Sequence, residues 1–222
     1  MYLPVDFAEP LRRGIATMAR RTPHACSILI PQGGVTAGIM AGTFATKEED
    51  ETICDPLRRG MVCFSRSKRV TNLLVSRGWK VDLECVVASY HGFRFPEHGI
   101  SGVSYRWLTV NDFPAVVATY HNVGEEYVLE RLEQGVLLGT YVGGNLAGYI
   151  GLHQEGTLGM LMIFPEFRRR HLATELEKRY CNILIDRGDL PFCDIVVGND
   201  ASVRLHARLG FSFERLHCWW LS

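Results

Sequence analysis

The segment at residues 161–179, LMIFPEFRRRHLATELEKR, constrains the fold of this chain more than any other. Apolar residues run up to Pro165, which ends a strand, and leucines at helical spacing begin at Leu172. Three consecutive arginines stand between the strand and the helix. A strand that feeds directly into a helix is a building unit of α/β folds, so this segment predicts a sheet with flanking helices.

The start of this helix has the chemistry of an anion site. The first backbone N–H groups of a helix have no partner within it, and the helix dipole favours negative charge there. Arginine side chains add charge-assisted hydrogen bonds that suit phosphate, and Thr174 brings a hydroxyl into the first turn. The segment therefore predicts a phosphate or pyrophosphate held after residue 167. The alternative is a basic helix start that meets only solvent or acidic neighbours.

The second half of the chain carries the clearest pattern of elements, in the order β-α-α-β-β-β-α-β-α-β. Strands are expected at residues 104–108, 136–142, 146–153, 157–164, 193–197 and 211–221, and helices at 113–121, 125–132, 172–187 and 200–209. The strand at 157–164 is nearly all apolar, as a strand buried on both faces should be. The predicted class is α/β (or α+β), with a mixed central sheet and flanking helices.

The first half of the chain is less regular. The elements expected are a helix at residues 11–20, a hairpin of strands at 27–30 and 36–44 around the turn 32–34, a solvated turn at 47–51, a helix at 70–76 and a strand at 79–90. Residues 91–102, rich in glycine and broken by Pro96, form a candidate linker. The predicted division is an N-terminal domain at 1–92, a linker at 93–102 and a C-terminal domain at 103–222.

The two halves also share a pattern of glycines and arginines. At a shift of 110, Gly33, Gly34, Ala37, Gly38, Arg58 and Arg59 fall on Gly143, Gly144, Ala147, Gly148, Arg168 and Arg169. Further on, a shift of 132 brings Leu73, Gly78 and Trp79 onto Leu205, Gly210 and Phe211. The change in shift predicts that the first half lacks the long helix and the strand after it. Glycine hairpins are common, but the constant offset favours a decayed duplication.

Two motifs with fixed spacing stand in the second half. The first is Arg168-Arg169-Arg170-His171-Leu172-Ala173 after Pro165-Glu166-Phe167, and the second is Asn199, Ser202, Leu205, His206, Gly210 and Phe211. They resemble the Arg/Gln-x-x-Gly-x-Gly/Ala loop and the Asn-x-x-Ala/Ser-x-x-Leu-Tyr-x-x-x-Gly-Phe motif of the GNAT superfamily of acyl-CoA-dependent N-acyltransferases. The resemblance implies the GNAT fold over residues 103–222, preceded by a partial GNAT-like domain.

The resemblance implies that acetyl-CoA, or another acyl-CoA, is bound as a co-substrate without a metal. The residues then expected to bind it are Leu161, Met162, Ile163, Arg168, Arg169, Arg170, His171, Leu172, Ala173, Thr174, Asn199 and Ser202. The strand at 157–164 is expected to splay at a bulge from the strand at 193–197, with the pantetheine in the gap. The N–H of Met162 or Ile163 is then placed to polarise the thioester carbonyl.

Three residues are candidates for proton transfer under this resemblance. The family base is often a glutamate near the strand before the loop; here Glu155, at the strand entrance, is the nearest acid, with His153 beside it. The alternative for Glu155 is a solvated turn residue, and the alternative for His153 is a capping side chain. His206 replaces the tyrosine that in many relatives protonates the leaving thiolate, a task a histidine can perform. The alternative for His206 is a half-buried helix residue.

One departure from the family pattern concerns the phosphate loop itself. His171 stands where the loop has its first glycine, the residue that allows the backbone to approach pyrophosphate closely. The histidine either bends the loop, adds a hydrogen-bond donor or weakens CoA binding.

The segment HQEGTLGML at residues 153–161 resembles the glycine N-acyltransferase-like branch, which pairs a decayed N-terminal half with an active C-terminal half. Under this interpretation Arg58-Arg59-Gly60 is a relic of a second phosphate loop that binds no CoA. The first half is then expected to cover a sheet edge and shape the acceptor cleft.

The predicted function is transfer of an acyl group, most simply acetyl, from CoA to the amine of a small molecule or amino acid. The alternative is a CoA-binding sensor or interaction module without catalysis. Lys plus Arg and Asp plus Glu both total 24, which argues against nucleic acid or a membrane as the main partner. Seven cysteines without a Cys-x-x-Cys pair, and no apolar run long enough for a membrane span, predict a cytoplasmic protein. Whether it forms a homodimer is left open.

Overall fold

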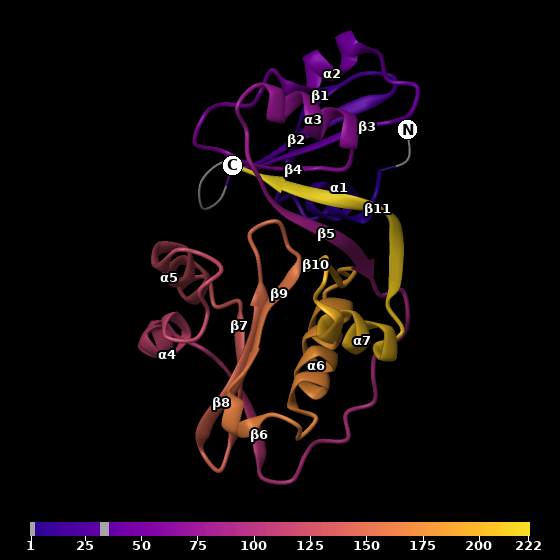
Figure 1. Cartoon of the computed structure of the whole chain (residues 1–222). Coiled ribbons are helices and arrows are strands. Elements are labelled where there is room, and N and C mark those ends of the chain that lie inside the picture. The colour runs from indigo at the N-terminus through magenta and orange to yellow at the C-terminus, as the bar shows by residue number, and fades with distance from the viewer. Residues whose placement is uncertain (1–2, 32–35) are drawn as a thin grey trace. The chain divides into compact units, whose positions relative to one another are not determined.

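The computed structural model describes residues 3–31 and 36–222, which divide into two compact units (Figure 1). Unit 1 contains Met1–Tyr90, Gln154–Gly156 and Phe192–Ser222, and unit 2 contains His91–His153 and Thr157–Pro191. Each unit is built on one sheet, of seven strands in unit 1 and four in unit 2. The glycine turn expected at 32–34 lies outside the described residues.

The sheet of unit 1 combines strands from both ends of the chain. Its strands are β1 (Thr17–Arg21), β2 (Ala25–Ile30), β3 (Thr36–Ala41), β4 (Val62–Ser65), β5 (Val81–Ser89), β10 (Phe192–Val196) and β11 (Ser212–Leu221), in the order β1-β2-β3-β4-β11-β5-β10. β3 and β4 are parallel, and the other neighbours are antiparallel. The last strand of the chain therefore lies between two strands of the first half.

The helices of unit 1 are α1 (Val5–Arg12), α2 (Lys47–Cys54), α3 (Lys68–Ser76) and α7 (Asp200–Leu209). Ile53 of α2 and Leu74 of α3 share an apolar core with Cys63 of β4, so both helices cover one face of the sheet. Phe64, the next residue of β4, faces the opposite side because side chains alternate along a strand. There its ring meets that of Phe7 of α1, with ring centroids 5.3 Å apart. Helices thus cover both faces.

Unit 2 is an antiparallel meander with helices on both faces. Its strands are β6 (Val103–Trp107), β7 (Leu137–Val142), β8 (Asn145–Leu152) and β9 (Leu158–Ile163), and its helices are α4 (Phe113–Val117), α5 (Glu125–Glu133), α6 (Leu172–Asp186) and the short 3-10 turns η1 (Val110–Asp112) and η2 (Pro165–Phe167). Val116 of α4 and Val128 of α5 share a core with Tyr149 of β8. Helix α6 lies on the other side of the sheet (Figure 1), where Tyr180 Oη donates to the Val136 carbonyl at 2.7 Å. This arrangement presents the start of α6 beside the end of β9.

The elements expected in the second half are confirmed, with ends that differ by a few residues. The largest difference is α4, which ends at Val117 instead of residue 121. The expected mixed sheet with flanking helices is confirmed as well.

The helix expected at residues 11–20 is wrong. Helix α1 ends at Arg12, Gly14 takes a φ of 70° that turns the chain, and strand β1 begins at Thr17. Four of the five side chains of β1 are exposed and the fifth is half-buried. The strand therefore has no alternation of apolar and polar residues that could identify it.

The solvated turn expected at residues 47–51 is also wrong, because these residues begin helix α2. Thr46 Oγ1 accepts from the Glu49 N–H at 3.2 Å, and Glu49 Oε2 accepts from the Thr46 N–H at 2.8 Å. This reciprocal pair is a capping box, which satisfies two N–H groups at the helix start. Ile53, on the inner face of the helix, is fully buried.

One order of elements occurs in both halves of the chain, at distances that differ in part from the expected shifts. The order β1-β2-β3-α2-β4-α3-β5 recurs as β7-β8-β9-α6-β10-α7-β11. Helices α3 and α7 begin at Lys68 and Asp200, which lie 132 residues apart (200 minus 68), the same distance as the later shift. Strands β3 and β9 begin at Thr36 and Leu158, a shift of 122 (158 minus 36), so the shift of 110 joins strands that do not correspond. The predicted loss of a helix and a strand is wrong, since α2 and β4 occupy these places.

The compact units follow a different division from the predicted domains. Strands β10 and β11 come from the second half but belong to the sheet of unit 1. Unit 2 begins at His91, next to the linker expected at 93–102. Within unit 2 this segment is held to α6, because Asn182 accepts from the Phe95 N–H at 2.8 Å and donates to its carbonyl at 3.0 Å.

All seven cysteines are buried. Burial raises the pKa of the thiols of Cys26, Cys54, Cys63, Cys85, Cys181 and Cys218, to about 11 for Cys26 and about 12 for Cys54 and Cys85. None of the helices in the described ranges combines the length and hydropathy that a bilayer span requires.

Candidate active site

Strand β9, one of the two edge strands of the sheet of unit 2, contains a bulge. Tyr149 pairs with Met162 and Gly151 with Gly159, so two residues of β9, Met160 and Leu161, stand opposite one residue of β8. Met160 has a φ of 52°, in the left-handed region that few non-glycine residues adopt. The expected bulge thus occurs in this strand, in its pairing with β8; the strand expected to splay from it at 193–197 is β10, in the sheet of unit 1. A bulge interrupts the ladder and redirects backbone groups, here at residues 160–163.

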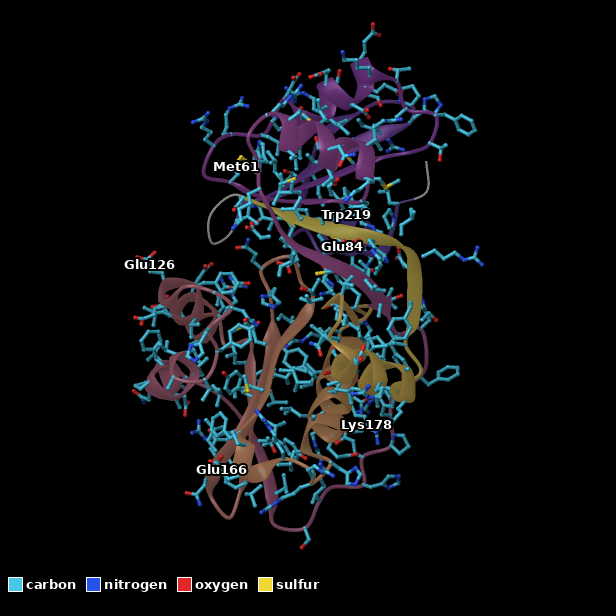
Figure 2. All side chains as sticks on the ribbon, viewed as in Figure 1. Met61, Glu84, Glu126, Glu166, Lys178 and Trp219 are labelled. Atoms are coloured by element: carbon cyan, nitrogen blue, oxygen red, sulfur yellow. The ribbon has the colours of Figure 1, made fainter. Side chains whose placement is uncertain are left out.

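The loop between β9 and α6 places three arginines at the surface. The chain passes through η2, and the side chains of residues 168–171 are exposed. Arg168 Nε donates to the Ile163 carbonyl at 3.1 Å, which holds its guanidinium beside the end of β9. The Arg170 guanidinium lies 5.7 Å from the centre of the Phe167 ring. Figure 2 shows the same segment, with Glu166 labelled in the turn and Lys178 on α6.

Helix α6 begins without a side-chain cap. His171 is its N-cap residue and its side chain makes no capping hydrogen bond. The acid of the first turn, Glu175, is paired with Lys178 at 2.9 Å, so its charge is balanced within the helix. Open N–H groups, the helix dipole and three exposed guanidinium groups fit a phosphate or pyrophosphate.

The position of His171 in this loop is strained. Its φ of 60° and the φ of 63° at Arg169 lie in the region that glycine enters freely. The histidine therefore holds a backbone conformation that glycine adopts without a steric penalty. Of the residues expected to bind the cofactor here, Leu172 is buried, so only its backbone N–H is suited to that role.

Asn199, Ser202 and His206 lie together on α7, in unit 1. Asn199 Oδ1 accepts from the Ser202 N–H at 3.1 Å and caps the helix. His206 Nδ1 is 2.8 Å from the Ser202 carbonyl and 3.2 Å from its hydroxyl. Because a carbonyl can only accept, Nδ1 carries a hydrogen. His206 is 4% exposed and meets the Phe211 ring edge-on at 4.8 Å, so it is more deeply buried than the half-buried alternative supposed.

His153 is held within unit 2 at the end of β8. Its Nδ1 is 2.9 Å from Tyr127 Oη, and its ring covers Gly159, where a Cβ atom would meet ring atoms at 2.4 Å. Its backbone N–H donates to the Thr157 carbonyl at 2.9 Å, which closes the turn into β9. These contacts fix the orientation of the ring.

Glu155 lies in a buried turn, not a solvated one. It is 6% exposed, and the turn Gln154–Gly156 belongs to unit 1. Arg13 Nη1 donates to the Gly156 carbonyl at 3.2 Å, and Gln154 Nε2 donates to the Thr36 hydroxyl. No local pattern points to Arg13 or Thr36, because each contacts the turn from more than 100 residues away in the chain.

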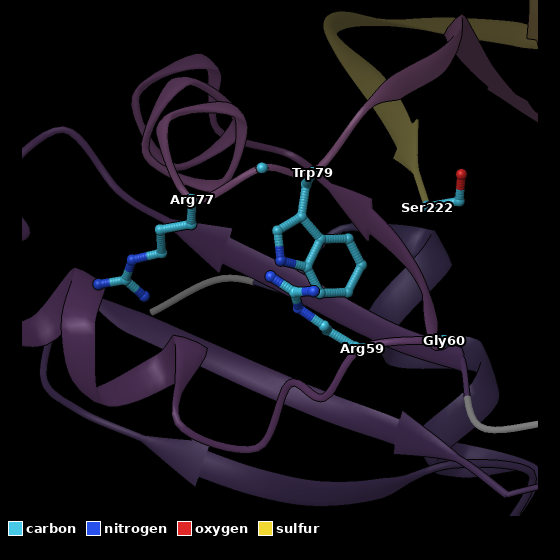
Figure 3. Close-up of a pocket in the computed structure, with 6 residues that line it drawn as sticks. Arg59, Gly60, Arg77, Trp79 and Ser222 are labelled. Carbon is cyan, nitrogen blue, oxygen red and sulfur yellow. The ribbon is translucent and has the colours of Figure 1, made fainter.

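Arg58-Arg59-Gly60, expected to be the relic of a phosphate loop that binds no CoA, occupies a different place in the fold from the loop before α6. These residues follow α2 and lead into β4, so they stand at no helix start. They border a hollow of about 220 Å³ lined by Arg59, Gly60, Arg77, Gly78, Trp79 and Ser222. Figure 3 shows the Arg59 side chain directed toward Trp79. The charge of Arg77 is paired with Glu51 of α2.

Comparisons with known proteins agree with this fold. Residues 104–211 match the model of the acetyltransferase (GNAT) family. A search of curated proteins finds no significant match. A structure from Drosophila has a TM-score of 0.71 at 19% identity, covering 91% of this chain and 76% of its own. A GCN5-related N-acetyltransferase from Kribbella flavida has a TM-score of 0.60 at 11% identity, covering 98% and 92%.

A third similar structure is an acetyltransferase of the GNAT family from Colwellia psychrerythraea, with a TM-score of 0.54 at 13% identity, covering 93% of this chain and 83% of its own. Identities at this level show the fold alone. The chain therefore has the mixed α/β GNAT fold, and residues 104–211 carry a GNAT acetyltransferase domain.

Proposed function

We propose that the protein transfers an acyl group from acetyl-CoA directly to the amine nitrogen of a small molecule or amino acid. One observation carries the proposal. Helix α6 begins uncapped after three exposed arginines and a bulged strand, within the region that matches the acetyltransferase family model. This is the arrangement that an anionic, thioester-bearing donor requires.

The donor would be held at two places. Arg168, Arg170 and the first-turn N–H groups of α6, with Arg169, His171, Ala173 and Thr174 around them, would bind the pyrophosphate. Backbone groups of residues 161–163, redirected by the bulge, would bind the pantetheine. The N–H of Met162 or Ile163 would stabilise the oxyanion.

The proton balance assigns two side chains. The amine nitrogen bonds to the carbonyl carbon as the C–S bond breaks, and the amine proton passes to Glu155, directly or through water, with His153 beside it. His206 would protonate the leaving thiolate from Nε2 as an imidazolium. Nδ1 is held by the two oxygens of Ser202, so Nε2 is the ring nitrogen assigned to this transfer.

The test is release of free thiol from acetyl-CoA across a panel of primary amines. Glu155→Gln is expected to lower turnover about 100-fold, in the range of general base catalysis, because it removes the proton acceptor. Its affinity for acetyl-CoA should stay within about twofold. Glu126→Gln, on the exposed start of α5 (Figure 2), is the matched control and should match the wild type. Near-normal turnover of Glu155→Gln at every pH would remove Glu155 as the base.

The second candidate is a CoA-binding sensor without catalysis. It is favoured by the burial of His206 and by the absence of an acid in the sequence of β9. Tight CoA binding with no thiol release for any amine of the panel would select it.

We also propose that the two halves descend from one GNAT-like unit, as in the glycine N-acyltransferase-like branch, with domains at 1–92 and 103–222. The recurring element order and the shift of 132 support this duplication. The segment HQEGTLGML supports the branch.

A further inference from the structure

The turn that carries Glu155 is held by residues of the first half of the chain. Arg13, at the end of α1, donates to the Gly156 carbonyl, and Thr36, the first residue of β3, accepts from Gln154. Both contacts lie within unit 1 and flank Glu155 on either side. The proposed base thus sits between two anchors that the second half does not supply.

Arg13 is itself fixed in place. Its side chain is 6% exposed, its Nε is 3.2 Å from Glu9 Oε2, and its guanidinium lies 5.7 Å from the centre of the Phe192 ring. A buried guanidinium is kept only where its charge and hydrogen bonds are satisfied. The Gly156 carbonyl in the turn is one of the hydrogen-bond partners that satisfy it.

The absence of a side chain at Gly156 leaves space for the Arg13 guanidinium. This glycine has a φ of 85°, and a Cβ atom there would meet Arg13 Nη1 at 2.9 Å. The absence of a side chain therefore permits both the tight turn and the close approach of the guanidinium. On the other side, Thr36 is 1% exposed and its hydroxyl has little freedom.

We infer that Arg13 and Thr36 are positioning residues for Glu155. The inference rests on the proposed role of Glu155 as base. A base is effective only when it is held within hydrogen-bond reach of the proton it accepts. A displacement of about 1 Å in such a group can lower the rate about 100-fold.

The chain offers a matched control for Arg13. Arg12 binds the same Glu9 carboxylate, at 2.8 Å, but its side chain is 48% exposed and its guanidinium is held by Glu9 on the surface of α1. Arg13→Gln should lower kcat about 10- to 100-fold, with the affinity for acetyl-CoA unchanged. Arg12→Gln should stay within about twofold of the wild type. Equal kcat values for the two variants would overturn the inference.

A cycle with Glu155 separates positioning from a general effect on the fold. If Arg13 acts through Glu155, the double variant Arg13→Gln/Glu155→Gln should be no slower than Glu155→Gln alone. Multiplied losses in the double variant would show an effect unrelated to the base and would overturn the inference.

A second pair of variants covers failure of Arg13→Gln to fold. Thr36→Val removes the hydroxyl that Gln154 binds and should lower kcat about 5- to 10-fold, a smaller loss than that expected from a displaced base. Thr36→Ser keeps the hydroxyl and should restore activity. Equal loss in both would assign Thr36 to packing and overturn its role.

Hydrogen exchange distinguishes failure of this inference from failure of the proposed function. In Arg13→Gln the amides of residues 154–157 should exchange at least about tenfold faster than in the wild type or Arg12→Gln. Unchanged exchange would overturn the inference, whatever the activity. Faster exchange in a protein that transfers no acyl group would support the anchoring and reject the proposed function.

Discussion

The first and second halves of this chain each contain a helix that follows a three-stranded segment, α2 and α6, and these two helices begin in opposite ways. Helix α2 starts with a closed capping box between Thr46 and Glu49 and has three acids in its first turn. Helix α6 starts with no side-chain cap, after three arginines. A helix start whose N–H groups are already bonded, and whose charge is negative, repels an anion. An open and positive start attracts one.

The difference shows how one element order can keep its fold and differ in chemistry. Both helices follow a strand and precede another, and both bury an apolar face. The capping residues and the charge of the loop decide whether the helix start is completed by the protein or by a ligand. In the first half the protein itself completes the helix start, through the capping box of α2.

Removing the arginines before the uncapped start of α6 should have the largest effect, because it should abolish the difference in anion binding between α6 and α2. Arg168→Ala/Arg170→Ala is expected to weaken CoA binding at least about 100-fold, since each charge-assisted hydrogen bond contributes about 1.5–3 kcal/mol. The measurement is calorimetric titration with CoA. Arg58→Ala/Arg59→Ala is the control from the first half and should bind CoA as the wild type does. Unchanged affinity in the first variant would remove the pyrophosphate assignment.

His171→Gly should sharpen the contrast by relieving the strain of the open start. The backbone already has a φ of 60°, which glycine adopts without a steric penalty. We expect a gain in stability of up to about 1 kcal/mol, measured by chemical denaturation, because the release of strain exceeds the added chain entropy. CoA affinity should rise or stay equal. A large loss of affinity would instead show that the imidazole itself binds the phosphate.

Removing the capping box at the start of α2 should have the smallest effect. Thr46→Ala removes one member of the capping box and should lower the free energy of unfolding by about 1 kcal/mol. It should leave CoA binding unchanged, since the three acids of α2's first turn repel an anion and the Arg69 guanidinium beside this turn is paired with one of them, Asp50. A gain in CoA affinity would contradict the assignment of this helix.

The same box makes a pH-dependent contribution to stability. Hydrogen bonds from the Thr46 N–H, and then from Thr22, lower the pKa of Glu49 from its ordinary value of 4.5 to about 2. The carboxylate therefore stabilises the fold above about pH 4.5, and this contribution is lost as the pH falls toward 2. Glu49→Gln should flatten the stability profile in that window relative to the wild type. An identical profile would show that the hydrogen bonds to Glu49 do not matter in solution.

The sequence predicted the second half well because its signals are local. Apolar periodicity, Pro165 and the glycine stops define β9, α6 and α7 with little help from distant residues. In the first half, the predictions at residues 11–20 and 47–51 were wrong because the local patterns there are weak or fit more than one structure. β1 is an exposed strand without alternation of apolar and polar residues. The Thr46–Glu49 spacing is that of a capping box, but the five charged residues at 47–51 that follow Thr46 also fit a solvated turn.

The candidate site divides in the same way. The arginine loop at residues 168–170 and the bulge in β9 could be predicted, because both lie within one short segment of sequence that contains a recognisable motif. The burial of Glu155 could not, because Arg13 and Thr36 lie 143 and 118 residues from the turn atoms that they bind. Contacts over such distances arise only when the sheet has formed.

The burial of every cysteine has a practical consequence for detecting the reaction. A disulfide reagent reacts with thiolates, and the raised pKa values of the six thiols described above keep the protonated form dominant at about pH 8. The folded protein should therefore give a nearly colourless blank, while each turnover liberates one reactive thiol from the donor. A blank that climbs during an assay would report unfolding, so one cuvette monitors both catalysis and the integrity of the fold.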